Sequence, residues 1–187
     1  MRVYIVHLTV PTRSKRSVLR TIRLPLEIDA LIGRDAEQRG VSVNAIVTSA
    51  LTRYAEWDRF ADRFGFITVT RAGHQRMLEA FSDSELSQMG DQLGAVNPRS
   101  MILFWYKRLD LETFLRWLQV QSRYGRFGEV EVEREGASAV VSIHHDEGPK
   151  NTLWLKHFLT AAVKDVVGVT PKVRTGSSSV VLRIDPP

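Results

Sequence analysis

A short strand is the first element that the alternation of apolar and polar residues predicts. Within residues 19–24, Ile22 and Leu24 fall on one face, and Thr21 and Arg23 fall on the other. A proline follows at once and ends the strand. A lone strand leaves its backbone N–H and C=O groups unpaired, so its natural partner is the same strand of a second copy of the chain.

Two amphipathic helices are predicted next. The first runs from Pro25, which suits an opening helical turn, to Gly40, which suits a helix stop. The second begins after Ser42, a good N-cap residue, and its apolar side chains recur at three- and four-residue intervals as far as Tyr54. Strand, helix and helix together form one small module that needs a partner to bury its apolar faces.

Beyond about residue 62 the pattern changes to a mixture of helices and strands with balanced charge, which predicts two domains, 1–62 and 63–187. The second is predicted to be an α+β domain whose antiparallel sheet is built as hairpin, helix, hairpin. The apolar run 101–106 fits a helix and a buried strand equally well, so this choice stays open. The other expected elements are a strand at 66–70, helices at 72–81, 84–94, 110–124 and from 149 onward, and hairpins turning at 135–136 and 176–177.

Positive charge is concentrated at the start of the chain. The net charge is +5, yet the first 25 residues contain six Lys and Arg and no acidic residue. A basic segment of this kind is typical of contact with phosphate. We expect phosphate contacts from Arg13, Lys15, Arg16 and Arg20. For residues 1–17 two interpretations stay open: an extra strand over residues 1–10, and an arm that reaches an adjacent minor groove. A solvated basic tail is the alternative.

The stretch RTIRLPLEIDALIGRDAEQRGVSVNAIVTSALTRY, within residues 18–60, resembles the MetJ/Arc ribbon-helix-helix superfamily. The resemblance implies an intertwined homodimer whose two strands form a ribbon in the major groove of double-stranded DNA. The base contacts would then fall to Leu19, Thr21 and Arg23. The start of the second helix, with its free N–H groups, would add phosphate contacts at Ser42, Val43 and Asn44.

Candidate chemistry in the second domain is sparse. The chain has no cysteine, so a metal site would need histidines and carboxylates. One such cluster, a candidate for a divalent metal, is His144, His145, Asp146 and His157. A polar strand-to-helix turn and a core histidine are the simpler interpretation of the same residues. No nucleophile, phosphate loop or metalloprotease motif is present, so no enzyme activity is predicted.

Six aromatic residues allow a further interpretation, in which they line a pocket for an apolar ligand. Such residues more often fill a hydrophobic core that contains no pocket. The six residues are Phe104, Trp105, Tyr106, Phe114, Trp117 and Trp154.

Together these features predict a sequence-specific DNA-binding transcriptional regulator. The second domain would sense a small-molecule or metal effector or join dimers into tetramers. Two alternatives stay open: an antitoxin-like autorepressor, and a metal- or small-molecule-binding protein that uses its N-terminal module only to dimerise. The apolar stretch in residues 1–10 is too short for a membrane span and lacks a cleavage pattern, so we expect a cytoplasmic protein.

Overall fold

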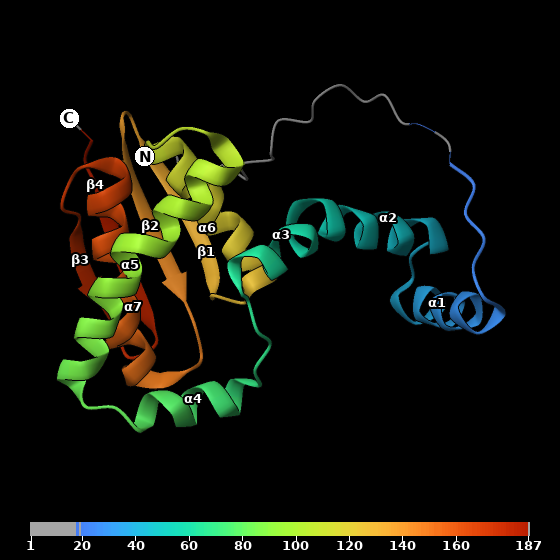
Figure 1. Cartoon of the computed structure of the whole chain (residues 1–187), viewed down its shortest axis with the longest axis horizontal. Coiled ribbons are helices and arrows are strands. Elements are labelled where there is room, and N and C mark those ends of the chain that lie inside the picture. The colour runs from blue at the N-terminus through green and yellow to red at the C-terminus, as the bar shows by residue number, and fades with distance from the viewer. Residues whose placement is uncertain (1–17, 19, 187) are drawn as a thin grey trace, which may run out of the picture. The chain divides into compact units, whose positions relative to one another are not determined.

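The computed structural model describes residue 18 and residues 20–186. The chain divides into two compact units, the first ending at Arg63 and the second beginning at Phe64 (Figure 1). The described helices include none with an apolar stretch long enough to cross a membrane. Mixed helix and antiparallel sheet make the fold α+β, as predicted.

The first unit contains the two predicted helices. Helix α1 (Leu26–Arg39) ends at Gly40, whose φ of 64° places it in the left-handed region that favours glycine. Helix α2 (Val43–Arg53) starts at Ser42, whose Oγ accepts a hydrogen bond of 3.1 Å from the amide of Ala45. The glycine stop and the serine cap are therefore confirmed. A π-helical turn (Tyr54–Asp58), α3 (Arg59–Ala61) and a 3-10 turn (Asp62–Phe64) follow.

The second unit is a one-sided antiparallel sheet covered by helices. The strands lie in the order β1-β2-β4-β3, and every neighbouring pair is antiparallel. Helix α6 packs on β1, α7 packs on β3 and β4, and α5 packs on α7 (Figure 1). The elements are α4 (Arg71–Glu79), α5 (Asp83–Tyr106), α6 (Leu111–Gly125), β1 (Glu129–Glu135), β2 (Ser138–His144), α7 (Gly148–Val167), β3 (Lys172–Thr175) and β4 (Ser179–Ile184).

Alternate residues of the two central strands build the core. In β2 and β4 every second side chain is fully buried, and the residues between them are mostly half-buried. This is the two-residue period that predicts the hairpins, and both hairpins are confirmed. The core-facing residues of the two strands are Ala139, Val141, Ile143, Val180, Leu182 and Ile184.

The strand predicted at residues 66–70 is wrong. This segment has no strand structure, and Ile67 is 80% exposed. It pairs with neither edge of the sheet, and Thr70 instead caps α4, its Oγ1 accepting a hydrogen bond from the amide of Gly73. A segment rich in β-branched and aromatic residues therefore does not form a strand unless a neighbouring strand can pair with it.

The helix stop predicted at Gly94 is also wrong, because α5 continues through Gly94 and Pro98 to Tyr106. Gly94 lies against the backbone of Phe158 in α7, where a Cβ atom would come within 2.1 Å of the carbonyl oxygen. The glycine thus serves close helix packing instead of helix termination. The same helix resolves the open choice at residues 101–106, which are helical.

Candidate functional site

The described part of the predicted ribbon segment, residues 20–24, is exposed in the single chain. Residues 20–24 form no strand and make no sheet contact within the described residues. Among the predicted DNA-contacting residues, Arg20, Thr21 and Arg23 are all exposed. The remaining positions of this prediction, Leu19, Arg13, Lys15 and Arg16, lie outside the described residues.

The start of α2 is also open to solvent. Ser42, Val43 and Asn44 are exposed, and the cap from the Ser42 side chain fixes the geometry of the first turn. Amide groups in the first turn of a helix have no acceptor within that helix. The first turn contains no acidic side chain. The amide groups that the cap leaves free and the positive end of the helix dipole can therefore meet an anion.

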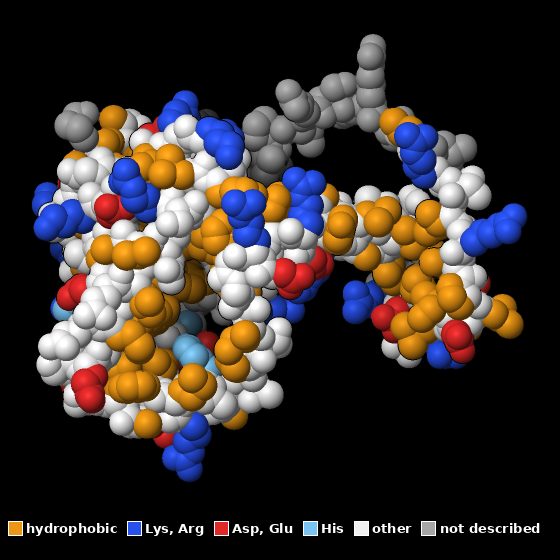
Figure 2. Space-filling model, in the orientation of Figure 1, with side chains coloured by type: hydrophobic (Ala, Val, Ile, Leu, Met, Phe, Trp, Pro, Cys, Tyr) orange, Lys and Arg blue, Asp and Glu red, His pale blue; other side chains and the backbone are white. Residues whose placement is uncertain are grey.

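The helices of the first unit leave large apolar side chains in solvent (Figure 2). Leu31 in α1 is 51% exposed, and Leu51 in α2 is 60% exposed. In α1 and α2, Ala36 is the one buried apolar residue among those described. Most of the large residues at the predicted core spacing are thus left exposed or only half-buried by the described part of the chain. The exposed apolar set on these helices and directly beside them is Leu26, Ile28, Leu31, Val41, Val43, Leu51 and Tyr54.

The candidate metal ligands are not brought together. His157 pairs with Asp91 of α5 at 3.1 Å, so it is hydrogen-bonded as in the simpler interpretation, but its side chain is only partly buried. His144 is exposed at the end of β2, and Asp146 pairs with Arg71. Among the described residues no three His, Asp or Glu side chains are placed to hold a metal ion.

His145 has a separate, structural setting. Its Nδ1 accepts a hydrogen bond from the amide of Glu147 at 3.3 Å, and its Nε2 lies 3.0 Å from the Oγ1 of the buried Thr152. Burial lowers the pKa of His145 and outweighs the opposing charges of Glu147 and Asp146. This histidine therefore joins the end of β2 to the first turns of α7 as a neutral ring.

A cavity of about 480 Å³ lies beside these residues. Figure 2 shows a hollow in the surface above α4, with histidine side chains (pale blue) beside it. The cavity is formed by the segment leading into α4, the end of α6 and the start of α7. Its lining residues are Val69, Arg71, His74, Gly125, Arg126, Phe127, Glu147, Asn151, Trp154 and Leu155.

Polar contacts join the two sides of this cavity. His74 of α4 pairs through its Nδ1 with Glu147, the residue before α7. The Nε2 of Gln75 donates a hydrogen bond of 3.2 Å to the carbonyl oxygen of Asp146. Together with the Arg71–Asp146 ion pair, these contacts hold α4 against the loop between β2 and α7.

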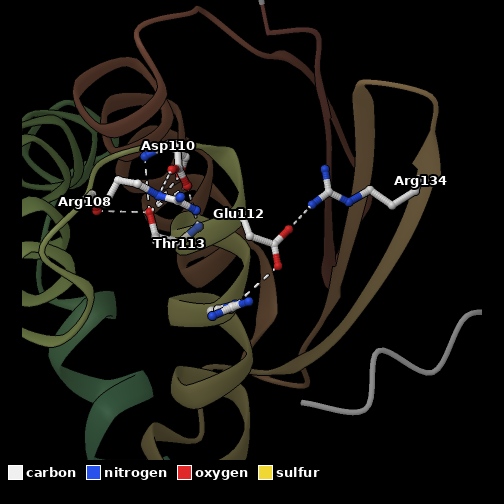
Figure 3. A network of polar contacts seen from close by, with 6 residues as sticks. Arg108, Asp110, Glu112, Thr113 and Arg134 are labelled. Carbon is white, nitrogen blue, oxygen red and sulfur yellow. Dashed lines mark hydrogen bonds and ion pairs between the residues drawn. The ribbon is translucent and has the colours of Figure 1, made fainter. Parts of the chain in front are cut away.

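The start of α6, the helix whose other end lines the cavity, is fixed by a polar network (Figure 3). Asp110 and Thr113 form a reciprocal capping box, with the Thr113 amide 2.9 Å from Asp110 Oδ1. Burial alone would raise the pKa of Asp110, but the hydrogen bonds from Thr113 and the charge of Arg108 lower it. Glu112 also holds β1, accepting a 2.5 Å hydrogen bond from Arg134. Asp110 is thus the N-cap residue of α6, the helix that the sequence predicts over residues 110–124.

Sequence patterns indicate only part of this cavity. Of the six aromatic residues considered for a pocket, Trp154 lines it, whereas Phe114 and Trp117 belong to the buried core. No pattern singles out Arg126. For Asn151 the signal in the sequence is a polar residue on the apolar face of α7.

Comparison of the chain with protein-family models, with curated proteins and with solved structures gives no match.

Proposed function

We propose that this protein is a homodimeric, sequence-specific DNA-binding regulator of the ribbon-helix-helix kind, with an effector-binding second unit. Residues 19–24 of two copies would pair antiparallel and place Thr21 and Arg23 in the major groove. The start of α2, with Ser42, Val43 and Asn44, would bind phosphate and set the position of the ribbon.

The observation that carries the proposal is the exposure of the apolar side chains on α1 and α2, directly after residues 20–24, which are exposed and form no strand. Two amphipathic helices with one buried apolar residue between them have too little core to be stable alone. A second copy supplies both the missing core and the missing partner strand. The pairing would also relate the two copies of Arg23 by a two-fold axis, as a reader of a palindromic site requires.

DNA binding by the full-length protein tests this proposal. Fragments selected from random duplex DNA should bind more tightly than unselected DNA, and affinity should fall steeply with rising salt. Arg23→Ala should reduce the preference for the selected site by about 1–3 kcal/mol for each guanine that Arg23 reads. Arg174→Ala is the matched control, because Arg174 is an exposed arginine of the second unit.

Two results would count against the proposal. One is equal affinity for selected and unselected DNA at physiological salt. The other is an equal effect of the Arg23 and Arg174 substitutions on site preference. A dimer without DNA affinity would instead favour the second candidate, a small-molecule-binding protein that uses its first unit only to dimerise. The cavity in the second unit is the observation that favours this candidate.

A further inference from the structure

The cavity in the second unit has the size and walls of a site for a small organic molecule. Its volume of about 480 Å³ falls within the range of about 300–1,000 Å³ that is common for ligand pockets. Val69, Phe127, Trp154 and Leu155 supply apolar surface. The Trp154 ring is held in place, since it stacks on Phe158 with ring centroids 4.9 Å apart and meets Phe127 edge to face at 6.2 Å.

Two buried polar atoms on this wall have no partner within the described protein. Asn151 is only 4% exposed and lines the cavity, yet its Oδ1 accepts no hydrogen bond. The Nε1 of Trp154, three residues further along α7, is buried and donates none. An unsatisfied buried polar group costs about 1–3 kcal/mol, so both groups favour a ligand that offers a matching donor and acceptor.

The charge of the cavity favours an anion. Glu147 is paired with His74, and Arg71 is paired with Asp146. Arg126, the residue after α6, also lines the cavity and makes no ion pair with the described residues. It has a φ of 56°, the left-handed conformation that is uncommon for a residue with a side chain. Because Glu147 and Arg71 are already paired, Arg126 is the cation that can bind a ligand.

From these features we infer that the cavity binds a small organic carboxylate with one apolar or aromatic group. The apolar group lies between Val69, Phe127 and Trp154, and the carboxylate pairs with Arg126. A hydrogen-bond donor on the ligand, such as the N–H of an indole ring, meets the free Asn151 Oδ1, and an acceptor on the ligand meets Trp154 Nε1. A role for this ligand as an effector rests on the proposed DNA-binding function, whereas its binding to the cavity does not.

Calorimetric titration of the full-length protein without DNA tests the inference. The probes are phenylacetate and indole-3-acetate, their neutral amides, and inorganic phosphate. The two carboxylates should bind saturably at one site per chain. Each amide should bind at least about tenfold more weakly, because its single carbonyl oxygen carries no charge and cannot form the bidentate ion pair that a carboxylate forms with Arg126. Phosphate should bind weakly, because it gains nothing from the apolar walls.

Two variants locate the site. Arg126→Gln should weaken carboxylate binding by about tenfold, and Arg174→Gln, an exposed arginine outside the cavity, should leave it unchanged. Asn151→Leu should weaken the binding of indole-3-acetate, whose N–H can donate to Asn151 Oδ1, more than that of phenylacetate, which has no such donor. It should not lower the melting temperature, because it replaces an unpartnered polar group with an apolar one. A merely structural Asn151 would instead lower the melting temperature when substituted.

Several results would overturn the inference. They are the absence of carboxylate binding at millimolar concentration, equal affinity for acids and amides, phosphate binding as tight as carboxylate binding, and binding that survives Arg126→Gln. Because no DNA is present, failure here leaves the DNA-binding proposal intact. Conversely, carboxylate binding by a protein that ignores DNA would refute only the effector role.

Discussion

At the scale of single residues, His145 shows how local contacts select a protonation state. Its Nδ1 accepts a hydrogen bond from the Glu147 amide, so this nitrogen carries no proton, and the proton of the neutral ring is on Nε2, facing Thr152. Thr152 in turn donates to the carbonyl oxygen of Ser177 at 3.0 Å. Protonation of Nδ1 would break the first of these hydrogen bonds and charge a partly buried ring.

This setting predicts a pH dependence of stability. Burial lowers the pKa of His145 in the folded state, so the unfolded chain binds the proton more readily. The free energy of unfolding should therefore fall as the pH drops below the ordinary value of 6.5, toward the lower folded pKa. His145→Gln should flatten this dependence in thermal melts between about pH 5 and pH 7.

His144→Gln, an exposed neighbour, is the matched control and should keep most of the slope. An unchanged slope in the His145 variant would show that other groups produce the pH dependence.

Residue roles could be predicted from sequence where the governing contact is local. Ser42 and Asp110 are caps whose partners lie three residues ahead, so spacing alone identifies them. The pairing of His157 with Asp91 joins residues 66 positions apart, and no pattern indicates it. The cavity residues could not be predicted for the same reason, because α4, α6 and α7 meet there only after folding.

At the scale of elements, periodicity identifies the two helices of the first unit, α6 and both hairpins. It fails where tertiary packing overrides a local signal. Gly94 is a helix breaker by propensity and Pro98 removes a backbone hydrogen bond, yet α5 runs through both. The glycine is needed where α5 meets α7, because a Cβ atom added at Gly90 or Gly94 would come too close to the α7 backbone.

Gly94→Ala tests the close packing of these two helices. A Cβ atom would lie 2.1 Å from the carbonyl oxygen of Phe158, so the helices must move apart. We expect a loss of about 1–3 kcal/mol or more in the free energy of unfolding of the second unit, measured by denaturant titration.

Gly33→Ala in α1 is the matched control, because nothing lies within 4 Å of its added Cβ. It should be neutral or stabilise its helix by about 0.5–1 kcal/mol. Equal stability of the Gly94 variant and the unmodified protein would contradict the close packing of α5 on α7.

At the scale of the whole molecule, the two units differ in how far each buries its own apolar side chains and pairs its own extended segments. The second unit has a contiguous core from Met101 to Ile184 and a sheet with every strand paired. The first unit has exposed apolar helix faces and a basic segment without a partner strand among the described residues. The sequence predicts this asymmetry, because a lone strand beside half-apolar helices needs a second chain. Within residues 20–186 the chain supplies no such partner strand.

Self-association is therefore the prediction that belongs to this scale. The full-length protein should sediment as a dimer at micromolar concentration, and Leu31→Glu should weaken the dimer. Burying a leucine contributes about 1.5–3 kcal/mol, and each dimer loses two such side chains. The dissociation constant should rise by roughly 100-fold or more, as about 3 kcal/mol implies.

Ala30→Glu is the matched control, because it adds the same charge at the neighbouring exposed position, off the apolar stripe of α1. It should leave the dimer intact. Because the ribbon would form only in the dimer, Leu31→Glu should also abolish preference for the selected DNA, although Leu31 contacts no base in the proposed complex. A monomeric unmodified protein, or a dimer indifferent to Leu31→Glu, would remove the basis for pairing residues 19–24 across two chains.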